Sequence, residues 1–315
     1  MDAIIAIPDD HKSRPLQGRR APSPRALVLT GVLAGAALLT VFVILRSGMQ
    51  FRLGELGPFV LLAAAMGAVA RYCRFRGLDP RAADAAAIVG LATLALLLCG
   101  LISNVGLRLG APTIDAALAR ADALVGWDVA RAVPAFAAHG WLIDGLAFIY
   151  NQSGPLVVAV IVLALMRGQS EKAWELVTTV VIAMQATAAI SIVAPARGAM
   201  AHFDLLHLQG NGLPLGAGVY HLGAFDHFHA GSDPRFGLAD MSGLVTFPSF
   251  HTVLGLLLVQ ALAHTRLRLA GLAMGAATIV STIPIGGHYV TDILAGCLVW
   301  LLAALAARRV SSPSG

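Results

Sequence analysis

The chain has few charged residues, few aromatic residues and only three cysteines. Charged side chains make up 12% of its 315 residues, against roughly a quarter in a typical soluble domain. So few charges do not cover a water-facing surface of this size, which excludes an ordinary soluble globular protein. Cys73, Cys99 and Cys297 have no metal-like spacing, so we expect neither disulfides nor a cysteine metal site.

Long apolar runs occupy most of the sequence instead. Apolar residues make up 57% of the chain, and the mean hydropathy is +0.78. A membrane-spanning helix needs about 20 mostly apolar residues. Eight segments meet this requirement approximately and predict an all-α, polytopic transmembrane helix bundle: residues 26–45, 57–73, 83–103, 142–166, 175–195, 249–265, 267–284 and 288–307.

The distribution of positive charge predicts how these spans are oriented. With the N-terminus in the cytoplasm, fifteen of the 22 Lys and Arg residues fall in inner segments and seven in outer ones. Cytoplasmic loops carry such an excess. We therefore expect both termini in the cytoplasm of a plasma or inner membrane, and we attribute the net charge of +5 to lipid contact and not to nucleic acid.

The spans divide the chain into four parts. Residues 1–25, rich in Pro, Arg and Ser, predict a disordered cytoplasmic tail. Residues 26–80 hold two N-terminal spans, residues 81–309 form a six-span catalytic membrane domain, and residues 310–315 are a second tail. The first span reads as an anchor, because no small-residue cleavage site follows it.

Two long outer segments remain between the spans. Residues 104–141 mix acidic, basic and apolar residues at helical spacing, which predicts a helix lying on the membrane surface. Residues 196–248 form a loop of a length that is usually functional. That loop holds five histidines: His202, His207, His221, His227 and His229.

Two polar groups lie at the edges of spans, where ionisable residues are costly and mark function. One is His251 in "FPSFHT", and the other is the His288 and Asp292 pair in "GGHYVTD". Residues at i and i+4 share a helix face, so Asp292 is expected to contact the His288 imidazole. A carboxylate in that place orients a catalytic histidine and stabilises its charged form.

The two histidines are expected on one side of the membrane, because the chain crosses twice between them. Each lies near a helix N-terminus, which favours a bound anion. Pro248 suits the first helical position, Ser249 is suited to cap the helix or to donate to an oxyanion, and Gly286 and Gly287 permit a tight turn. Alone, each residue has a simple structural explanation, but together they predict phosphoryl transfer.

These residues resemble the second and third signature motifs of the type 2 phosphatidic acid phosphatase superfamily, Pro-Ser-Gly-His and Ser-Arg-(five residues)-His-(three residues)-Asp. The match is nearest to its inositol phosphorylceramide synthase-like (inositolphosphotransferase) branch, where a bulky residue replaces the glycine, as Phe250 does here. The run from His288 to Gly296 is similar to that branch as well. The resemblance implies a six-helix core beginning near residue 83.

The resemblance also implies a covalent mechanism without a metal or other cofactor. His288 would attack phosphorus to form a phosphohistidine, supported by Asp292. His251 would protonate the departing oxygen and then activate the acceptor. Ser249, the Gly287 amide and a basic group would hold the phosphate of a lipid substrate.

The chain departs from the family pattern where phosphate is usually bound by cations. Thr282 occupies the arginine position of the third motif, and the Lys and Arg of the first motif have no recognisable counterpart. Arg197 is the first candidate for a replacement, against an ordinary interfacial role, and Arg120 and Arg131 follow it. We expect Asn151, Gln152 and Ser153 to bond helix to helix rather than to line the site.

Several alternatives remain at this stage. Head-group transfer is favoured over hydrolysis of phosphatidic acid or a polyprenyl diphosphate, because of Phe250 and the missing arginine. A transporter fits eight spans, but the polar residues gather at the membrane edge and not at mid-bilayer. A metal site would use His221 and the segment from Asp226 to His229. The oligomeric state, the phosphate donor and the acceptor stay open.

Overall fold

The computed structural model describes residues 23–231, 235–237, 243 and 246–310. Residues 1–22 and 311–315 of the two predicted tails lie outside the described residues. The structure confirms an all-α membrane bundle, whose longer helices are α1 (Pro24–Ser47), α2 (Leu53–Phe75), α3 (Pro80–Leu107), α6 (Gly140–Met166), α7 (Ser170–Val193), α10 (Phe250–Leu262), α11 (Arg268–Ser281) and α12 (Val290–Arg309). The strands β1 (Gln50–Phe51) and β2 (Arg235–Phe236) pair in parallel.

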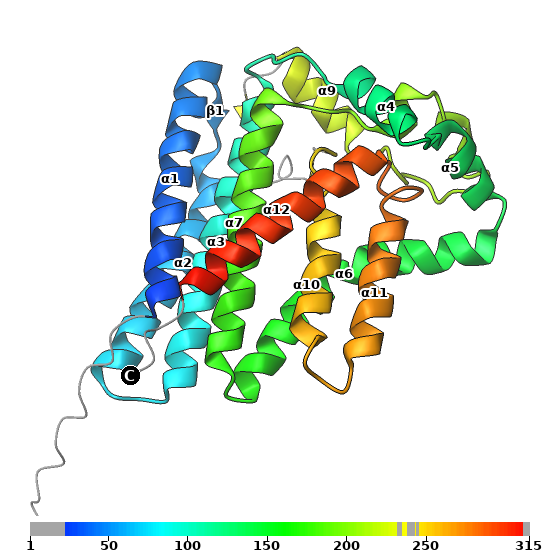
Figure 1. Cartoon of the computed structure of the whole chain (residues 1–315). Helices are drawn as coiled ribbons and strands as arrows, with labels where there is room; N and C mark the ends of the chain where they lie inside the picture. Colours follow the sequence, from blue (N-terminus) through cyan, green and yellow to red (C-terminus); the bar gives the residue numbers. More distant parts are fainter. Residues whose placement is uncertain (1–22, 232–234, 238–242, 244–245, 311–315) are drawn as a thin grey trace, which may run out of the picture.

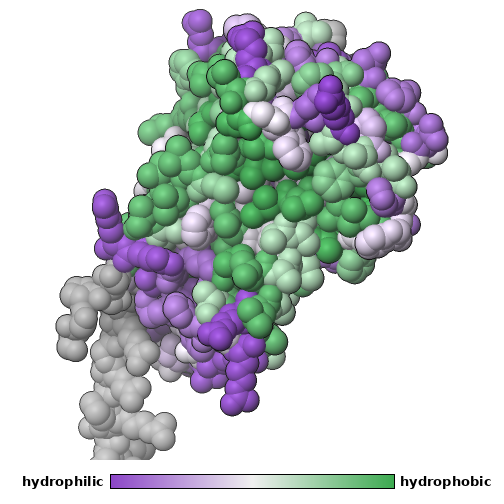
Figure 2. Space-filling model, turned by 45° about the vertical axis from the view of Figure 1, so that its right-hand side comes forward, coloured by the Kyte–Doolittle hydropathy of each residue, from purple (hydrophilic) through white to green (hydrophobic). Residues whose placement is uncertain are grey.

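The surface has the polarity of an integral membrane protein. Six of these helices are long and apolar enough to cross a membrane, and α10 and α11 are shorter apolar helices. Figure 2 shows a broad apolar band across the middle of one face, with hydrophilic residues gathered toward its ends. Large apolar side chains such as Leu38 and Leu45 on α1 are more than 70% exposed. They are suited to contact lipid acyl chains.

The helices form two groups that meet at α7. The first is an upright layer in which α2 packs on α3, while α3 packs on α1 and α7 (Figure 1). In the second, α10 packs on α11, α12 and α6, and α12 crosses obliquely over α7. A common apolar core of Leu29, Ile102, Trp174 and Leu257 joins the two groups.

Arg25 ties the first helix to the last. Its side chain is 6% exposed. The guanidinium donates to the Ala307 carbonyl at 3.2 Å, near the end of α12, and to the backbone and carboxylate of Glu171 at 2.9 and 2.6 Å. A buried charge of this kind is tolerated only when it is paired. The N-terminal spans are therefore firmly joined to the remaining helices.

Short helices cover the other end of the bundle, which we call the capped end: α4 (Asp115–Leu124), α5 (Val129–Ala137), α8 (Ala199–His202), α9 (Leu222–Ala230) and the 3-10 turn η1 (Leu206–Leu208). The surface helix that the sequence predicts within residues 104–141 is in fact two helices, α4 and α5. Gly126 turns the chain with φ +75°, and Asp128 caps α5 by accepting the Arg131 amide at 3.2 Å. Leu118 and Val133 bury the inner faces of α4 and α5.

Candidate active site

The two histidine segments meet under the capped end. Ser249 Oγ lies 3.5 Å from His288 Nε2, and the Ser249 amide donates to the Asp292 carbonyl at 3.1 Å. Gly296 on α12 permits this approach, because a Cβ atom there would lie 2.5 Å from the Ser249 carbonyl oxygen. The structure therefore brings together segments that are separated by two helices in the chain.

His288 and Asp292 form the predicted pair, but by a different geometry. His288 Nδ1 lies 3.0 Å from an Asp292 carboxylate oxygen. The prediction placed both residues within one helix, whereas α12 begins only at Val290. Asp292 is the third residue of α12 and also accepts the Tyr289 amide at 3.0 Å, so the pair belongs to a capping box.

The geometry leaves one ring nitrogen of His288 for chemistry. A carboxylate beside Nδ1 favours the tautomer that carries its proton there, and Nε2 then faces the Ser249 hydroxyl. The backbone carbonyl of Thr246 also interacts with the ring. Burial lowers the pKa of the His288 imidazole to about 4. A neutral ring is the form that a nucleophile requires.

The N-terminus of α12 is already filled by carboxylates. Asp122 on α4 accepts the Val290 amide at 2.9 Å, the Thr291 amide at 2.8 Å and the Thr291 hydroxyl at 2.6 Å. Together with Asp292, it occupies the amides that were predicted to attract a phosphate. That prediction is wrong for α12, because amides already bonded to carboxylates do not bind a second anion.

The N-terminus of α10 is less occupied. Ser249 is its N-cap and accepts the Thr252 amide at 3.4 Å. Pro248 precedes the cap and does not hold the first helical position, so that detail of the prediction was wrong. His251, in the first turn, stacks on Tyr150 of α6 with ring centroids 3.8 Å apart. Of the two helix ends, α10 therefore offers the better anion site.

Arg197 lies in a loop whose backbone is fixed by buried groups. Asp115 accepts the Arg197 amide at 3.0 Å and the Gly198 amide at 2.9 Å. The Arg197 carbonyl accepts from His221 Nε2 at 2.8 Å. The loop then touches the glycine turn before His288, because the Ala199 amide donates to the Gly287 carbonyl at 2.8 Å.

The Arg197 guanidinium has an acidic partner at the surface. Its Nη2 atom lies 2.7 Å from Asp226 of α9, while its Nε is buried and meets no acceptor among the described residues. Arg131 pairs with Asp128 at 3.1 Å and is strongly exposed. Arg120 is exposed on the opposite side of α4 from Asp115 and Asp122. Of the three candidate arginines, Arg197 is the one whose loop contacts the His288 turn, through the Ala199 amide.

Thr282 takes no part in phosphate binding through its side chain. It is fully buried, and its hydroxyl donates to the Ile279 carbonyl at 2.7 Å. Its own carbonyl accepts the His288 amide at 3.1 Å. At this position the chain has a residue that supports the turn, where the family motif has a phosphate-binding arginine.

Gly287 shapes that same turn. It has φ +70°, a conformation that glycine adopts without strain, and an added Cβ would lie 2.8 Å from the Gly218 carbonyl. The Gly287 amide donates to no described residue. It remains available to a bound oxygen.

Four residues of the site were missed in the sequence, namely Asp115, Asp122, Tyr150 and Tyr289, and His221 was considered only as a loop histidine and metal ligand. A signal existed for the two acids, since they lie seven residues apart and share a helix face with Leu118. Acidic residues on the apolar face of a helix point to buried partners. Tyr289 donates its hydroxyl to Asp115 at 3.1 Å, which links the Arg197 loop to the residue beside His288.

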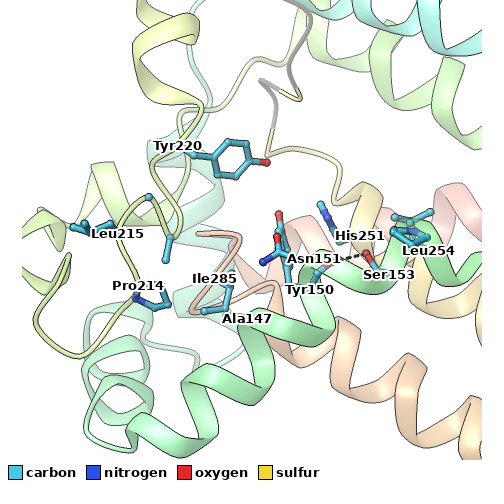
Figure 3. A pocket seen from close by; sticks show the side chains of 14 residues that line it. Ala147, Tyr150, Asn151, Ser153, Pro214, Leu215, Tyr220, His251, Leu254 and Ile285 are labelled. Carbon is cyan, nitrogen blue, oxygen red and sulfur yellow. Dashed lines mark hydrogen bonds between the residues drawn. The ribbon is translucent and has the colours of Figure 1, made fainter.

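A cavity of about 480 Å³ lies on the His251 side of the site (Figure 3). Tyr150, Asn151 and Ser153 of α6 line it together with Tyr220 and His251. The expectation that Asn151 and Ser153 bond helix to helix is therefore corrected. Asn151 is exposed, and Ser153 donates to the Tyr150 carbonyl of its own helix at 2.7 Å.

The loop histidines lie apart from one another. His229 bonds the Ala111 carbonyl at 2.9 Å and His207 lies 3.2 Å from the Asp204 carbonyl. Within the described part of the chain, no group of three His, Cys, Asp or Glu residues could hold a metal ion. Two of the proposed metal ligands contact Arg197 instead. Asp226 accepts from its guanidinium, and His221 bonds to its backbone carbonyl.

A comparison with known families identifies this arrangement. Residues 116–306, more than half of the chain, match the PAP2 superfamily. The chain belongs to the PAP2 superfamily. This superfamily membership supports a phosphatase-type enzyme that acts on lipid phosphates. No curated protein and no solved structure matches the chain.

The PAP2 match includes every group described at the site except Asp115. It begins inside α4 and ends inside α12, so it spans α6, α7, α10 and α11 and the loops of the capped end. The helices α1, α2 and α3 precede it. The match identifies the superfamily and leaves the substrate and the choice between hydrolysis and transfer to be argued.

Proposed function

We propose that this protein transfers the phosphoryl group or the phosphorylated head group of a membrane lipid through a covalent intermediate on His288. The observation that carries this proposal is the contact of His288 with Asp292 at Nδ1, which leaves Nε2 directed at Ser249 and the N-terminus of α10. The proposed nucleophile His288, the carboxylate that orients it and the anion site at the N-terminus of α10 are therefore close together, as a phosphoryl-transfer site requires.

The proposed reaction has two steps. The Nε2 lone pair of His288 attacks phosphorus, a P–N bond forms, and the P–O bond to the alcohol breaks while His251 donates a proton to the departing oxygen. In the second step His251 takes a proton from water or from a second alcohol, whose oxygen attacks phosphorus and releases His288. The anionic substrate favours the protonated form of His251 before the first step.

Three groups are proposed to hold the non-bridging oxygens. The Ser249 hydroxyl and the Gly287 amide donate hydrogen bonds, and Arg197 supplies the positive charge. Arg197 would then exchange Asp226 for phosphate, or hold both. Asp115 and His221 fix the backbone of Arg197, so only its side chain would have to move.

Head-group transfer is the form of the reaction that we favour, as in the inositolphosphotransferase-like branch. Phe250 in the second motif and buried Thr282 in the third support it, since both replace residues of the simple phosphatases. Hydrolysis of phosphatidic acid is the second candidate. We place the site at the extracytoplasmic face and both termini in the cytoplasm, as the charge distribution predicts.

The test is an assay of purified protein in detergent with phosphatidic acid and phosphatidylinositol, which records phosphate release and head-group exchange. His288→Ala is expected to abolish turnover, and Asp292→Asn to lower it by about 10³-fold or more, because an amide does not orient the imidazole as a carboxylate does. His207→Ala, on an exposed loop, serves as the matched histidine control and should keep wild-type activity.

A labelled phospho-enzyme gives the sharper readout. Quenching in alkaline detergent should trap an acid-labile, base-stable phosphohistidine in the wild type and none in His288→Ala. Full turnover of either variant, or a phospho-enzyme that survives in His288→Ala, would refute the proposed nucleophile.

A further inference from the structure

A second cavity lies at the capped end, between α4 and α8. It has a volume of about 470 Å³, and we call it the α4–α8 cavity. Alanines from one face of α4 line it together with Arg120, Trp127, Asp128, His202 and Phe203. None of these residues lines the cavity beside His251. The lining combines small, aromatic and charged side chains, as binding sites for small polar groups do.

The α4–α8 cavity adjoins the support of the active site without being part of it. The rings of His202 and Phe203 lie 6.2 and 6.3 Å from the ring of Tyr289, between centroids. Tyr289 is fully buried and directly follows His288. No residue to which we assign a part in phosphoryl transfer lines this cavity. A ligand here would therefore occupy a site of its own.

Arg120 gives the cavity a positive charge that no described residue neutralises. Its side chain is exposed and forms no hydrogen bond or ion pair with any described residue. Asp128, the other charged residue of the described lining, already accepts the Arg131 amide at 3.2 Å and pairs with its guanidinium at 3.1 Å. The cavity therefore favours an anionic ligand.

Trp127 adds a hydrogen-bond donor to the same cavity. Its indole N–H is buried and has no acceptor within the described part of the chain. Buried donors normally have a partner. A phosphate has acceptors both for such a donor and for a guanidinium, with which it forms charge-assisted hydrogen bonds.

The turn beside the cavity favours a lipid over a free phosphate. Leu124 and Val125 lie between two lining positions of the chain and are 89% and 61% exposed. Arg120 and Leu124 are four residues apart on α4 and share a helix face. Trp141, at the start of the span α6, is 78% exposed and is of the type enriched at the lipid–water boundary. A lipid with its head group in the cavity would place acyl chains beside Leu124 and Val125.

We propose that the α4–α8 cavity is a second lipid site, which binds the head-group phosphate of an anionic phospholipid and does no chemistry on it. Arg120 and the Trp127 N–H would hold the phosphate, while the acyl chains extend past Leu124 and Val125 into the leaflet at the capped end. The inference goes beyond the proposed function and does not depend on it.

The experiment uses Trp127 as a reporter in the cavity wall. Fluorotryptophan replaces the four tryptophans, and Trp127→Phe assigns the fluorine NMR resonance of Trp127. The protein in detergent is titrated with dioctanoyl phosphatidylglycerol, dioctanoyl phosphatidylcholine and inorganic phosphate. We expect a saturable shift with phosphatidylglycerol, at a Kd about 10-fold below that of the zwitterionic lipid. Inorganic phosphate should require about 100-fold more, since it has no acyl chains to bury.

Two matched pairs of variants test the site. Arg120→Gln should raise the Kd for phosphatidylglycerol about 10-fold, the loss of one charge-assisted hydrogen bond, whereas Arg46→Gln, an exposed arginine near the end of α1, should not. Ala116→Phe fills the cavity and should abolish the shift. Ala117→Phe, at the next exposed position of α4 and outside the lining, should keep it. The resonance of buried Trp174 reports that each variant is folded.

The outcomes separate this site from the phosphoryl-transfer site. A Kd for phosphatidylglycerol that neither Arg120→Gln nor Ala116→Phe changes overturns the site. Equal affinity for inorganic phosphate overturns the lipid ligand, and equal affinity for phosphatidylcholine overturns the preference for an anionic one. The titrations need no turnover, so the inactive His288→Ala protein should bind phosphatidylglycerol as the wild type does, and a failure here leaves the phosphohistidine proposal standing.

Discussion

The N-termini of α10 and α12 meet at one site, yet they are occupied in different ways. At α12, carboxylates from Asp122 and Asp292 accept the amides of Tyr289, Val290 and Thr291. At α10, the cap is the neutral hydroxyl of Ser249. The sequence predicted two equivalent anion sites, whereas the structure makes one end a fixed support and leaves the other for a ligand.

The difference shows what a helix end can contribute to catalysis. An end whose amides are bonded to buried carboxylates is held rigidly but adds negative charge close to the substrate. An end capped by a hydroxyl keeps its positive character and adds a donor. In this site the nucleophile belongs to the rigid end and the proposed phosphate position to the positive end.

The largest loss of activity is expected when the N-terminus of α10 is given a carboxylate cap, as the N-terminus of α12 has. Ser249→Asp and Ser249→Asn both provide a good N-cap of nearly equal size, but the aspartate adds a negative charge beside His288. We expect kcat/KM of Ser249→Asp to fall about 100-fold below that of Ser249→Asn, because like charges a few ångströms apart repel strongly in a buried site.

Thermal unfolding of the same two variants checks that the fold is equally retained. Inorganic vanadate, a phosphate analogue, should inhibit Ser249→Asn more strongly than Ser249→Asp. Equal activity and equal inhibition of the two variants would mean that phosphate does not bind at the α10 end.

A smaller effect is expected when the support at α12 is removed. Asp122→Ala leaves two part-buried amides and one hydroxyl without an acceptor, at a cost of about 3 kcal/mol in the free energy of unfolding. The thermal midpoint should fall by roughly 5–10 °C, and kcat should fall with little change in KM. Asp144→Asn, an exposed acid on α6, is the control and should leave both unchanged.

One outcome for Asp122→Ala would contradict a role in positioning His288. If its stability drops while kcat stays at the wild-type value, then Asp122 supports the fold without positioning His288.

The smallest effect concerns pH and His221, which fixes the Arg197 backbone. Burial lowers the pKa of the His221 imidazole from its ordinary value, so the folded protein holds the ring neutral while the unfolded chain protonates it below about pH 6.5. Stability from this group is complete above that pH and is lost as the pH falls. His221→Gln, which still donates to Arg197, should show a shallower fall of the thermal midpoint between pH 6.5 and 5. Parallel curves for the two proteins would contradict the buried neutral imidazole.

Much of the fold was accessible from the sequence, because membrane spans are read from local composition. Each apolar run predicted a helix, and the structure has a helix at each of these runs. These include the two shorter apolar helices, α10 and α11. Counting crossings predicted that His251 and His288 lie on one side of the membrane, and the structure adds that their segments are in contact. The contact of Asp292 with His288 followed from spacing, although a capping box and not a continuous helix produces it.

The support of the site was not accessible, because it comes from distant parts of the chain. Asp122 lies 168 and 169 residues from its partners on α12, and Asp115 lies 174 residues from Tyr289. No local pattern specifies which acid will fill which helix end. The cavity was missed for the same reason, since Asn151 and Tyr220 meet only through tertiary packing.

Arg25 and Asp122 together give α12 a balanced electrostatic environment along its whole length. The partial positive charge of its first turn faces a carboxylate from α4, and the partial negative charge of its last turn faces a guanidinium from α1. The helix that follows the nucleophile therefore has a group of opposite charge at each end. One belongs to the N-terminal spans and the other to the capped end, so these two distant parts of the molecule hold the same helix in place.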